Sequence, residues 1–276
     1  MDGYQIVSFK ATEELTAIIT AVLMSNGFEA IEEKEEETIA SIPLALFDEQ
    51  DVKVIFNNYS TLYTVKKVAQ QNWNAQWESS FQPVIIEKFV TVRASFHQKN
   101  TTVLHDIIIT PKMSFGTGHH ATTYLMIQEM ESINFKNKSV IDFGTGTGVL
   151  AILAEKLGAA SVLAIDNDEW SINNANENIK ANNCNLINLQ LSCKMLDHQT
   201  AGVLLANINL NVIIENMCHI KKVCTRETTV LLSGMLLCDV DAISEKISQE
   251  GFYIDKITDK EGWVVLSVKL LKAYAQ

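Results

Sequence analysis

The sequence predicts an α/β protein with a doubly wound, mostly parallel sheet that ends in an antiparallel hairpin, preceded by a small α+β domain. From residue 139 onward, apolar strand-like runs alternate with amphipathic helical runs, a rhythm typical of βαβ units. Near the carboxyl end, "FYIDKITDK" and "WVVLSVKLL" are separated only by Glu261 and Gly262. Two strands joined by so short a turn must be antiparallel.

The first 67 residues predict the small domain. "YQIVSFKA" alternates with a period of two, and the helical run after it buries one face and stops at Asn26 and Gly27. Residues 29–47 indicate two strands around an acidic turn, and residues 60–70 supply another extended segment. We expect a ferredoxin-like order. The acidic run at residues 32–37 is read as a solvated hairpin tip, with a surface for a basic partner as the alternative.

Residues 68–82 predict a linker helix between the two domains. Trp73 and Trp77 are four residues apart and so share a helical face, and Pro83 closes the segment. We interpret the tryptophans as an aromatic seam that fastens the helix to one domain, rather than as a ligand cage. The remaining residues, 83–276, form the predicted catalytic domain.

The elements of the catalytic domain follow from hydrophobic periodicity. Two β-rich runs, "VIIEKFVTVRASF" and "TVLHDIIIT", come first and end at Pro111. The parallel strands are then read in "SVIDF", "SVLAID", "LINLQLS", "VLLANI" and "TTVLLSGM". Helices are predicted between them in "GVLAILAEKLG", "EWSINNANENIKANN", "NVIIENMCHIKKVCT" and "DVDAISEKISQEG".

Composition narrows the class of protein. The chain has 276 residues, 47% of them hydrophobic, and a formal net charge of −11. This charge argues against binding to nucleic-acid phosphates and is compatible with a basic protein partner. Five cysteines without a C-x-x-C pair predict reduced thiols. We expect a cytoplasmic protein without signal peptide or membrane span, and we expect it to be a monomer.

A glycine-rich turn in "FGTGTGVLA" predicts a ligand site between a buried strand and a helix. Gly144, Gly146 and Gly148 permit a tight bend and a close approach of the ligand, although a turn without a ligand is the plainer alternative. The spacing G-x-G-x-G differs from the dinucleotide pattern G-x-G-x-x-G, and no phosphate-binding G-x-x-x-x-G-K-[ST] run is present. Asp142, two residues before the first glycine, would repel a pyrophosphate and suits an ammonium and a sulfonium. These charges favour S-adenosylmethionine over NAD.

Two further strand ends carry candidate ligand-binding residues. Asp166 ends the second strand of the repeat, where an acidic side chain accepts hydrogen bonds from ribose hydroxyls. Asp168 and Glu169 fit this role less well, because they begin the following helix and suit its dipole. Asn207 ends the fourth strand and is expected to point into the crevice; capping of the next helix is the alternative.

Taken together, these motifs resemble the bacterial ribosomal protein L11 methyltransferases, a lysine-methylating branch of the Rossmann-like S-adenosylmethionine-dependent enzymes. The resemblance spans the small domain, "NWNAQW" in the linker and the catalytic domain, and "PKMSFGTGHHATT" is its most specific element. It implies that the loop containing Phe115 folds over the cofactor, and that Thr123, Gly144, Asp166 and Asn207 contact it. With Asp142 and Gly146, these are our candidate cofactor-binding residues. The two F-G-T-G runs would then be opposite walls of one pocket.

The resemblance also implies a function. The small domain would recognise the ribosomal protein and present its lysine side-chain and N-terminal amines for methylation. Two residues depart from the family pattern: Lys112 stands where glycine is usual, and Gly202 where an acidic residue commonly begins the fourth strand. His119 and His120 are adjacent and lack further ligands, so we predict no metal site.

Several alternatives stay open at this stage. Methyltransferases that act on adenine or on glutamine amides resemble one another in an N-P-P-Y motif at this strand end. This chain instead reads Asn-Ile-Asn-Leu from Asn207 to Leu210. The substrate could be another protein or a small-molecule amine. A Rossmann NAD-dependent oxidoreductase and a binding module without catalysis are the remaining readings. We assign no catalytic base, since a water-poor cleft near a cation lowers the pKa of an amine without one.

Overall fold

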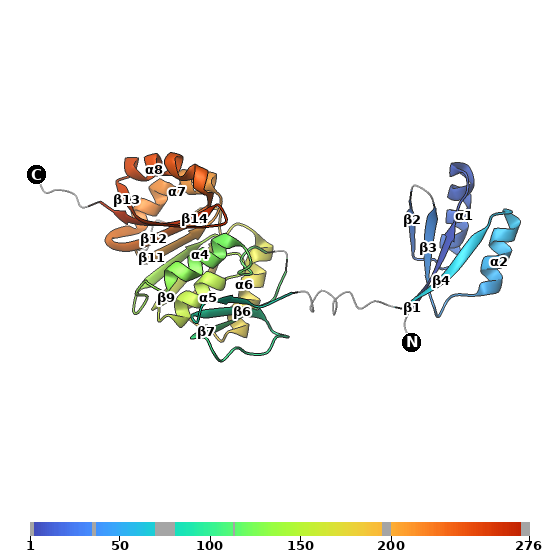
Figure 1. Cartoon of the computed structure of the whole chain (residues 1–276), viewed down its shortest axis with the longest axis horizontal. Coiled ribbons are helices and arrows are strands. Elements are labelled where there is room, and N and C mark those ends of the chain that lie inside the picture. Colours follow the sequence, from blue (N-terminus) through green and yellow to red (C-terminus); the bar gives the residue numbers. More distant parts are fainter. Residues whose placement is uncertain (1–2, 35–36, 70–80, 113, 195–199, 272–276) are drawn as a thin grey trace, which may run out of the picture. The chain divides into compact units, whose positions relative to one another are not determined.

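The computed structural model describes residues 3–34, 37–69, 81–112, 114–194 and 200–271. The chain divides into two compact units, Met1–Phe81 and Gln82–Gln276, each drawn with its elements in Figure 1. Most of the linker helix predicted over residues 68–82, with both tryptophans, falls on residues 70–80, which lie outside the described residues. Residues 68 and 69 end a strand instead, and residues 81 and 82 are not helical.

The N-terminal unit is a four-stranded antiparallel sheet in the order β2-β3-β1-β4. Its elements follow one another as β1 (Gly3–Phe9), α1 (Glu13–Ser25), β2 (Ala30–Glu33), β3 (Thr38–Pro43), α2 (Glu49–Asn58) and β4 (Tyr63–Ala69). This βαββαβ arrangement confirms the ferredoxin-like prediction. Helix α2 was not predicted as a separate element, although Asp48 caps it by accepting hydrogen bonds from the backbone N–H groups of Gln50 and Asp51.

The C-terminal unit is built on a seven-stranded sheet in the order β10-β9-β8-β11-β12-β14-β13. Strands β8 to β12 are parallel, and β13 and β14 form the predicted antiparallel hairpin, with β14 also antiparallel to β12. The seven strands are β8 (Ser139–Phe143), β9 (Ser161–Asp166), β10 (Ile187–Leu191), β11 (Ala201–Asn207), β12 (Cys224–Leu236), β13 (Phe252–Lys260) and β14 (Trp263–Leu270).

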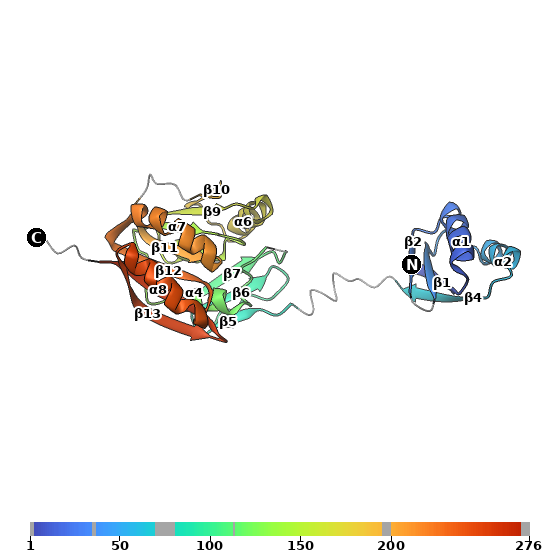
Figure 2. The same cartoon turned by 90° about the horizontal axis from the view of Figure 1, so that it is seen from above.

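Helices cover both faces of this sheet, as the doubly wound prediction requires (Figure 2). Helices α4, α5 and α6 contact one another in sequence on one face, and α7 packs with α8 on the other. Their bounds are α4 (Ala121–Met130), α5 (Val149–Lys156), α6 (Glu169–Ala181), α7 (Leu210–Val223) and α8 (Val240–Gln249). Among the described residues, we find no helix that combines the length and the apolar character needed to cross a membrane.

A separate three-stranded sheet contains β5 (Val84–Ile86), β6 (Val90–Ala94) and β7 (His105–Ile109). Strand β6 pairs antiparallel with β5 and parallel with β7, so β7 is an edge strand. Helices α5 and α6 pack against β7. The chain leaves β7 at Thr110 and runs into the first F-G-T-G loop, so this small sheet determines where that loop begins.

Candidate functional site

The second glycine loop connects the end of β8 to the start of α5. Gly144, Gly146 and Gly148 have φ values of 81°, 55° and 79°, in the left-handed region that favours glycine. A Cβ atom on Gly144 would collide with the Ile208 side chain, and one on Gly146 would collide with the Phe115 carbonyl oxygen. These glycines are therefore required by neighbouring protein atoms as well as by any ligand.

The two F-G-T-G loops lie directly against each other. The Thr147 backbone N–H donates to the Phe115 carbonyl at 3.0 Å, and the Thr147 hydroxyl donates to the Gly116 carbonyl at 2.7 Å. Thr147 is fully buried beneath this contact. Residues about thirty positions apart in the sequence are thus held together by two short hydrogen bonds, and both loops reach the same cleft.

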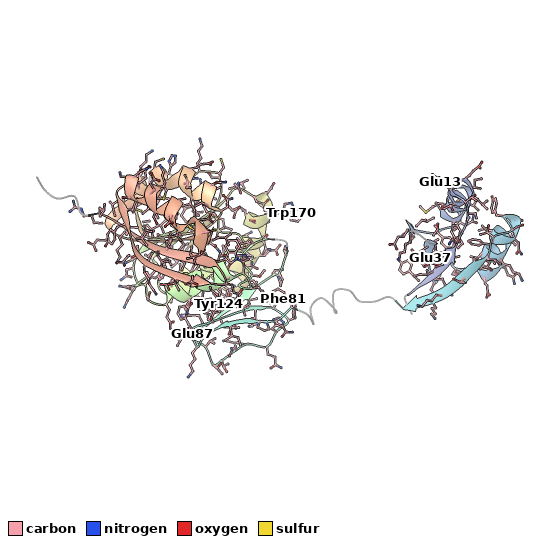
Figure 3. All side chains as sticks on the ribbon, turned by 45° about the horizontal axis from the view of Figure 1, so that its top comes forward. Glu13, Glu37, Phe81, Glu87, Tyr124 and Trp170 are labelled. Carbon is pink, nitrogen blue, oxygen red and sulfur yellow. The ribbon has the colours of Figure 1, made fainter. Side chains whose placement is uncertain are left out.

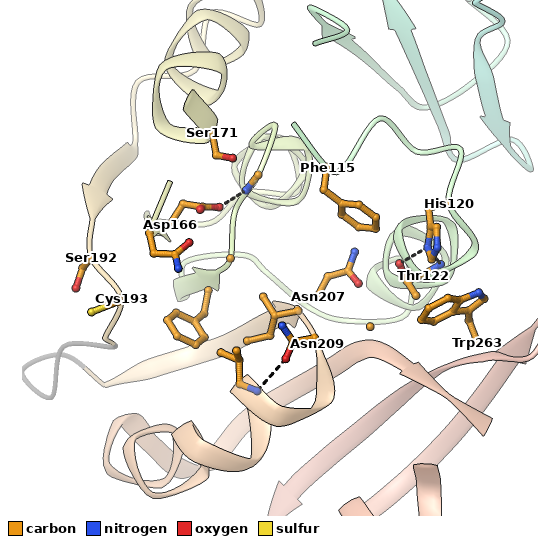
Figure 4. A pocket seen from close by; sticks show the side chains of 17 residues that line it. Phe115, His120, Thr122, Asp166, Ser171, Ser192, Cys193, Asn207, Asn209 and Trp263 are labelled. Carbon is orange, nitrogen blue, oxygen red and sulfur yellow. Dashed lines mark hydrogen bonds between the residues drawn. The ribbon is translucent and has the colours of Figure 1, made fainter. Parts of the chain in front are cut away.

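That cleft has a volume of about 440 Å³ and opens at the carboxyl ends of the parallel strands (Figure 4). Ligands of open α/β sheets bind at this edge. The cleft is lined by Phe115, His120, Thr122, Phe143, Gly144, Gly146, Asp166, Asn167, Ser171, Ser192, Cys193, Asn207, Ile208, Asn209, Val212, Gly234 and Trp263. Five of the seven residues predicted from the sequence are in this set.

Asp166 stands at the end of β9, next to the glycine loop. Its carboxylate accepts hydrogen bonds from the backbone N–H groups of Gly146, at 2.8 Å, and Asp168, at 3.1 Å. Asp168 itself caps α6 by accepting from the N–H groups of Trp170 and Ser171, as expected for a residue that serves the helix. Trp170 lies at the surface with 78% of its area exposed (Figure 3).

Asn207 ends β11 and is the polar side chain at the centre of the cleft (Figure 4). Its Nδ2 donates to the Thr123 hydroxyl at 3.3 Å, while its Oδ1 is buried and has no hydrogen-bond partner among the described residues. Asn209, and not Asn207, caps α7 by accepting from the Val212 N–H, so the capping alternative for Asn207 is wrong. A buried amide oxygen without a donor is costly, and a ligand N–H would satisfy it.

Thr123 and Asp142 lie behind the residues that line the cleft and do not line it themselves. Thr123 is 1% exposed and holds the Asn207 amide. Asp142 is fully buried, and its Oδ2 accepts from the Thr145 hydroxyl at 2.6 Å. Burial raises the pKa of Asp142 to about 7, an effect that the Asp166 charge reinforces and the Thr145 hydrogen bond opposes.

Sequence reasoning named Phe115 but missed the two rings, His120 and Trp263, that complete the aromatic wall of the cleft. The His120 ring lies 5.1 Å from the Phe115 ring and 4.6 Å from the Trp263 ring, both edge to face. His120 caps α4 through its Nδ1, which accepts from the Thr122 N–H at 3.3 Å. Trp263 begins β14, almost 150 residues after Phe115. Only the final antiparallel hairpin brings it to the site, and no local sequence signal marks it.

The two departures from the family pattern have local structural partners. The Lys112 ammonium bridges both carboxylate oxygens of Glu177 on α6, at 2.8 and 2.7 Å. Gly202 lies against Lys138, where a Cβ would come within 2.9 Å of the Lys138 Cβ. Among the described residues, no group of three or more His, Cys, Asp or Glu side chains is placed to hold a metal ion.

One cleft is thus surrounded by three features of the parallel sheet. They are the glycine loop after β8, the acidic residue at the end of β9 and the asparagine at the end of β11. This fold and site define the class of S-adenosylmethionine-dependent methyltransferases. Within it, the family model described as "Ribosomal protein L11 methyltransferase (PrmA)" matches residues 7–270. The chain therefore belongs to the ribosomal protein L11 methyltransferase family.

Individual relatives agree with this membership. A ribosomal protein L11 methyltransferase of Phocaeicola vulgatus is 34% identical over 262 residues, covering 92% of this chain and 93% of the relative. One of Chlorobaculum parvum is 34% identical over 274 residues, covering 94% and 93%. The crystal structure of a ribosomal protein L11 methylase from Lactobacillus delbrueckii subsp. bulgaricus aligns with a TM-score of 0.65 at 26% identity, covering 70% of this chain and all of that one.

Proposed function

We propose that this chain transfers methyl groups from S-adenosylmethionine to lysine side-chain amines and to the N-terminal amine of ribosomal protein L11, at the cleft between the two F-G-T-G loops. The observation that carries the proposal is the unpartnered Asn207 Oδ1, a buried acceptor at the centre of that cleft. Family membership supplies the substrate class, and the cleft supplies a place for the reaction.

The residues present fit the cofactor. Asp166 is only half-buried at its strand end and can accept hydrogen bonds from ribose hydroxyls. Gly144 and Gly146 let the backbone approach the ligand without side chains in between. Asn207 would receive an N–H of the amino-acid part of the cofactor or of the target amine. When bound, the cofactor supplies a methyl group on a sulfonium.

The target amine must be uncharged to act as a nucleophile. A lysine with a pKa of about 10.4 loses its proton at pH 7 at a cost of roughly 4.6 kcal/mol. Phe115, Phe143, Ile208 and Trp263 give the cleft an apolar lining, and an apolar wall lowers the pKa of an amine that enters it. His120 already uses its Nδ1 to cap α4, and we assign it no role as a base. Orientation by Asn207 and desolvation are the contributions we infer.

Recognition of the ribosomal protein is assigned to the N-terminal unit. That unit has its own core, which includes Val7, Phe9, Ile19, Leu23 and Phe56. The described residues that line the cleft lie in the C-terminal unit. We also propose that the enzyme works as a monomer and, because the substrate is a ribosomal protein, that it works in the cytoplasm.

The cofactor site is tested by footprinting. Cys193 lines the cleft, whereas Cys218 is exposed on α7 away from it. Burial raises the pKa of Cys184 to about 11 and that of Cys224 to about 12, so these thiols stay protonated at pH 8. S-adenosylhomocysteine should slow alkylation of Cys193 by iodoacetamide and leave Cys218 unaffected, as measured by peptide mass spectrometry. Equal labelling of Cys193 with and without the ligand would place the cofactor elsewhere.

The role of Asn207 is tested by substitution. Asn207→Ala should reduce methylation of ribosomal protein L11 by at least about 100-fold while the protein remains folded, because orientation in the cleft is lost. Asn188→Ala, an exposed asparagine on β10, serves as the matched control and should retain wild-type kinetics. Unchanged turnover in Asn207→Ala would remove this residue from the reaction.

A further inference from the structure

Helix α6 and its C-cap residue, Asn182, carry three buried asparagines on one face. Asn174, Asn178 and Asn182 are four residues apart, and their exposed fractions are 1%, 0% and 8%. A buried amide is costly unless its donors and acceptor are paired, so each must have a partner nearby. An apolar residue would fill these positions at lower cost if the helix only needed to pack.

The partners lie along the free edge of strand β7. Asn182 accepts from the Ile108 N–H at 3.0 Å and donates to the Ile108 carbonyl at 2.6 Å. Asn178 accepts from the Thr110 N–H at 2.7 Å. Four helical residues rise about 6.0 Å and two strand residues about 6.6 Å, so the helix can match alternate residues of the strand. The asparagines thus replace the neighbouring strand that β7 lacks.

Asn178 also reaches the second glycine loop. Its Nδ2 donates to the Thr147 carbonyl and to the Asn174 Oδ1, each at 2.8 Å. Asn174 in turn donates to the Ser114 hydroxyl of the first loop, at 3.5 Å. One fully buried side chain therefore bonds both to the residue from which the first loop departs and to a residue of the second loop.

We infer that Asn178 is a positioning residue that sets the spacing of the two F-G-T-G loops across the cofactor cleft, with Asn174 as its support. The Thr147 residue held by Asn178 is the same one that donates to Phe115 and Gly116. Asn178 touches neither the cleft nor the reacting groups, so it acts through the loops. This inference rests on the proposed function, since it assumes that the cofactor binds between these loops.

The test compares Asn178→Leu with Asn182→Leu in the full chain. Both variants remove an amide that bonds to the β7 edge, and both should lower the melting temperature. Only Asn178→Leu also removes the bond to Thr147. It should weaken S-adenosylhomocysteine binding, measured by calorimetry, about tenfold more than Asn182→Leu, and raise the KM for S-adenosylmethionine while kcat changes less.

Hydrogen exchange supplies a second readout. In Asn178→Leu, the Thr147 amide, which donates to the Phe115 carbonyl, should lose protection while the amides of β9 keep it. If Asn178→Leu fails to fold, Asn174→Ala takes its place as the test. This variant keeps the hydrogen bonds of Asn178 to Thr110 and Thr147 and removes the one to Asn174. We expect a two- to fivefold loss of affinity for S-adenosylhomocysteine. Equal affinity losses in Asn178→Leu and Asn182→Leu, or unchanged affinity in Asn174→Ala when that variant decides, would overturn the inference. Failure of the wild-type chain to bind S-adenosylhomocysteine would instead overturn the proposed function.

Discussion

Asp142 shows that the role of a residue depends on where the fold places its side chain. The sequence suggests a carboxylate that faces a cationic ligand, but the fold buries it completely behind the glycine loop. One of its oxygens accepts from Thr145, and in the part of the chain that the structure describes the other has no hydrogen-bond partner. Since burial raises its pKa to about 7, the side chain is partly protonated at neutral pH. Its hydrogen bond to Thr145 holds the loop, whichever ligand the loop contacts.

This placement predicts a pH-dependent stability. The unfolded chain releases the Asp142 proton near pH 3.8, whereas the folded chain retains it until about pH 7. Between these values the folded state binds more protons, so the free energy of unfolding should fall as the pH rises, by up to a few kcal/mol at about 1.4 kcal/mol per pH unit. Asp142→Asn should remove this part of the slope in urea unfolding at pH 5 and pH 8. The exposed Asp259→Asn should keep the wild-type slope, and an identical slope in Asp142→Asn would contradict the assignment.

Strand ends explain which site residues could be predicted. Asp166 and Asn207 each close a recognisable apolar strand, so their convergence follows from the parallel sheet. Trp263 and Cys193 could not be found in this way. Trp263 reaches the cleft because β14 inserts between β12 and β13. Cys193 follows a strand run that ends in Leu191 and Ser192, without the acidic or amide side chain that marks Asp166 and Asn207. Where residues meet only because of the order of strands in the sheet, the local sequence does not indicate that they lie together.

At the scale of elements, the two glycine loops behave as one unit. Gly146 has its α-carbon so close to the Phe115 carbonyl that no side chain fits between them. Gly251, between α8 and β13, shares the left-handed conformation with a φ of 84°, but a Cβ there would meet only the end of the Lys221 side chain at 3.8 Å. The two glycines therefore share a left-handed backbone conformation and differ in what an added Cβ atom would contact.

This pair separates the cost of conformation from the cost of collision. Gly251→Ala should destabilise the protein by about 1 kcal/mol, the usual cost of an L-residue in this region. Gly146→Ala should lose more stability and, in addition, most of its affinity for S-adenosylhomocysteine, because the first loop must move away. Thermal unfolding and calorimetry measure the two effects. Equal stability losses with retained binding would show that the loops are not interlocked in solution.

Most helices and strands could be predicted because each carries its own local pattern of apolar residues. The βα repeats from residue 139 and the final hairpin carry strong periodic patterns, and both are present. Helix α2 was missed, since its apolar residues are confined to one short run, Val52, Val54, Ile55 and Phe56, in an otherwise polar segment. The contact between the two F-G-T-G loops was expected only from the family resemblance. The donors and acceptors that join them are mostly backbone atoms, which the sequence does not display.

At the scale of the whole molecule, the two-unit architecture is consistent with our proposal that one unit binds the cofactor and the other selects the substrate. Each unit has its own hydrophobic cluster, and every residue that lines the cleft belongs to the C-terminal unit. A domain with its own core can fold alone. Recognition of the ribosomal protein is the role we propose for the N-terminal unit.

Removing residues 1–67 tests this division of labour. The shortened chain should bind S-adenosylhomocysteine with an affinity close to that of the full chain, because Phe115, Asp166 and Asn207 all remain. It should methylate ribosomal protein L11 far more slowly, since the substrate would reach the cleft only by unassisted encounter. Calorimetry and a labelled-methyl assay report the two quantities on the same preparation, and adding residues 1–67 as a separate chain controls for tethering. Normal methylation by the shortened chain would place recognition on the C-terminal unit, and lost cofactor binding would mean that the units depend on each other to fold.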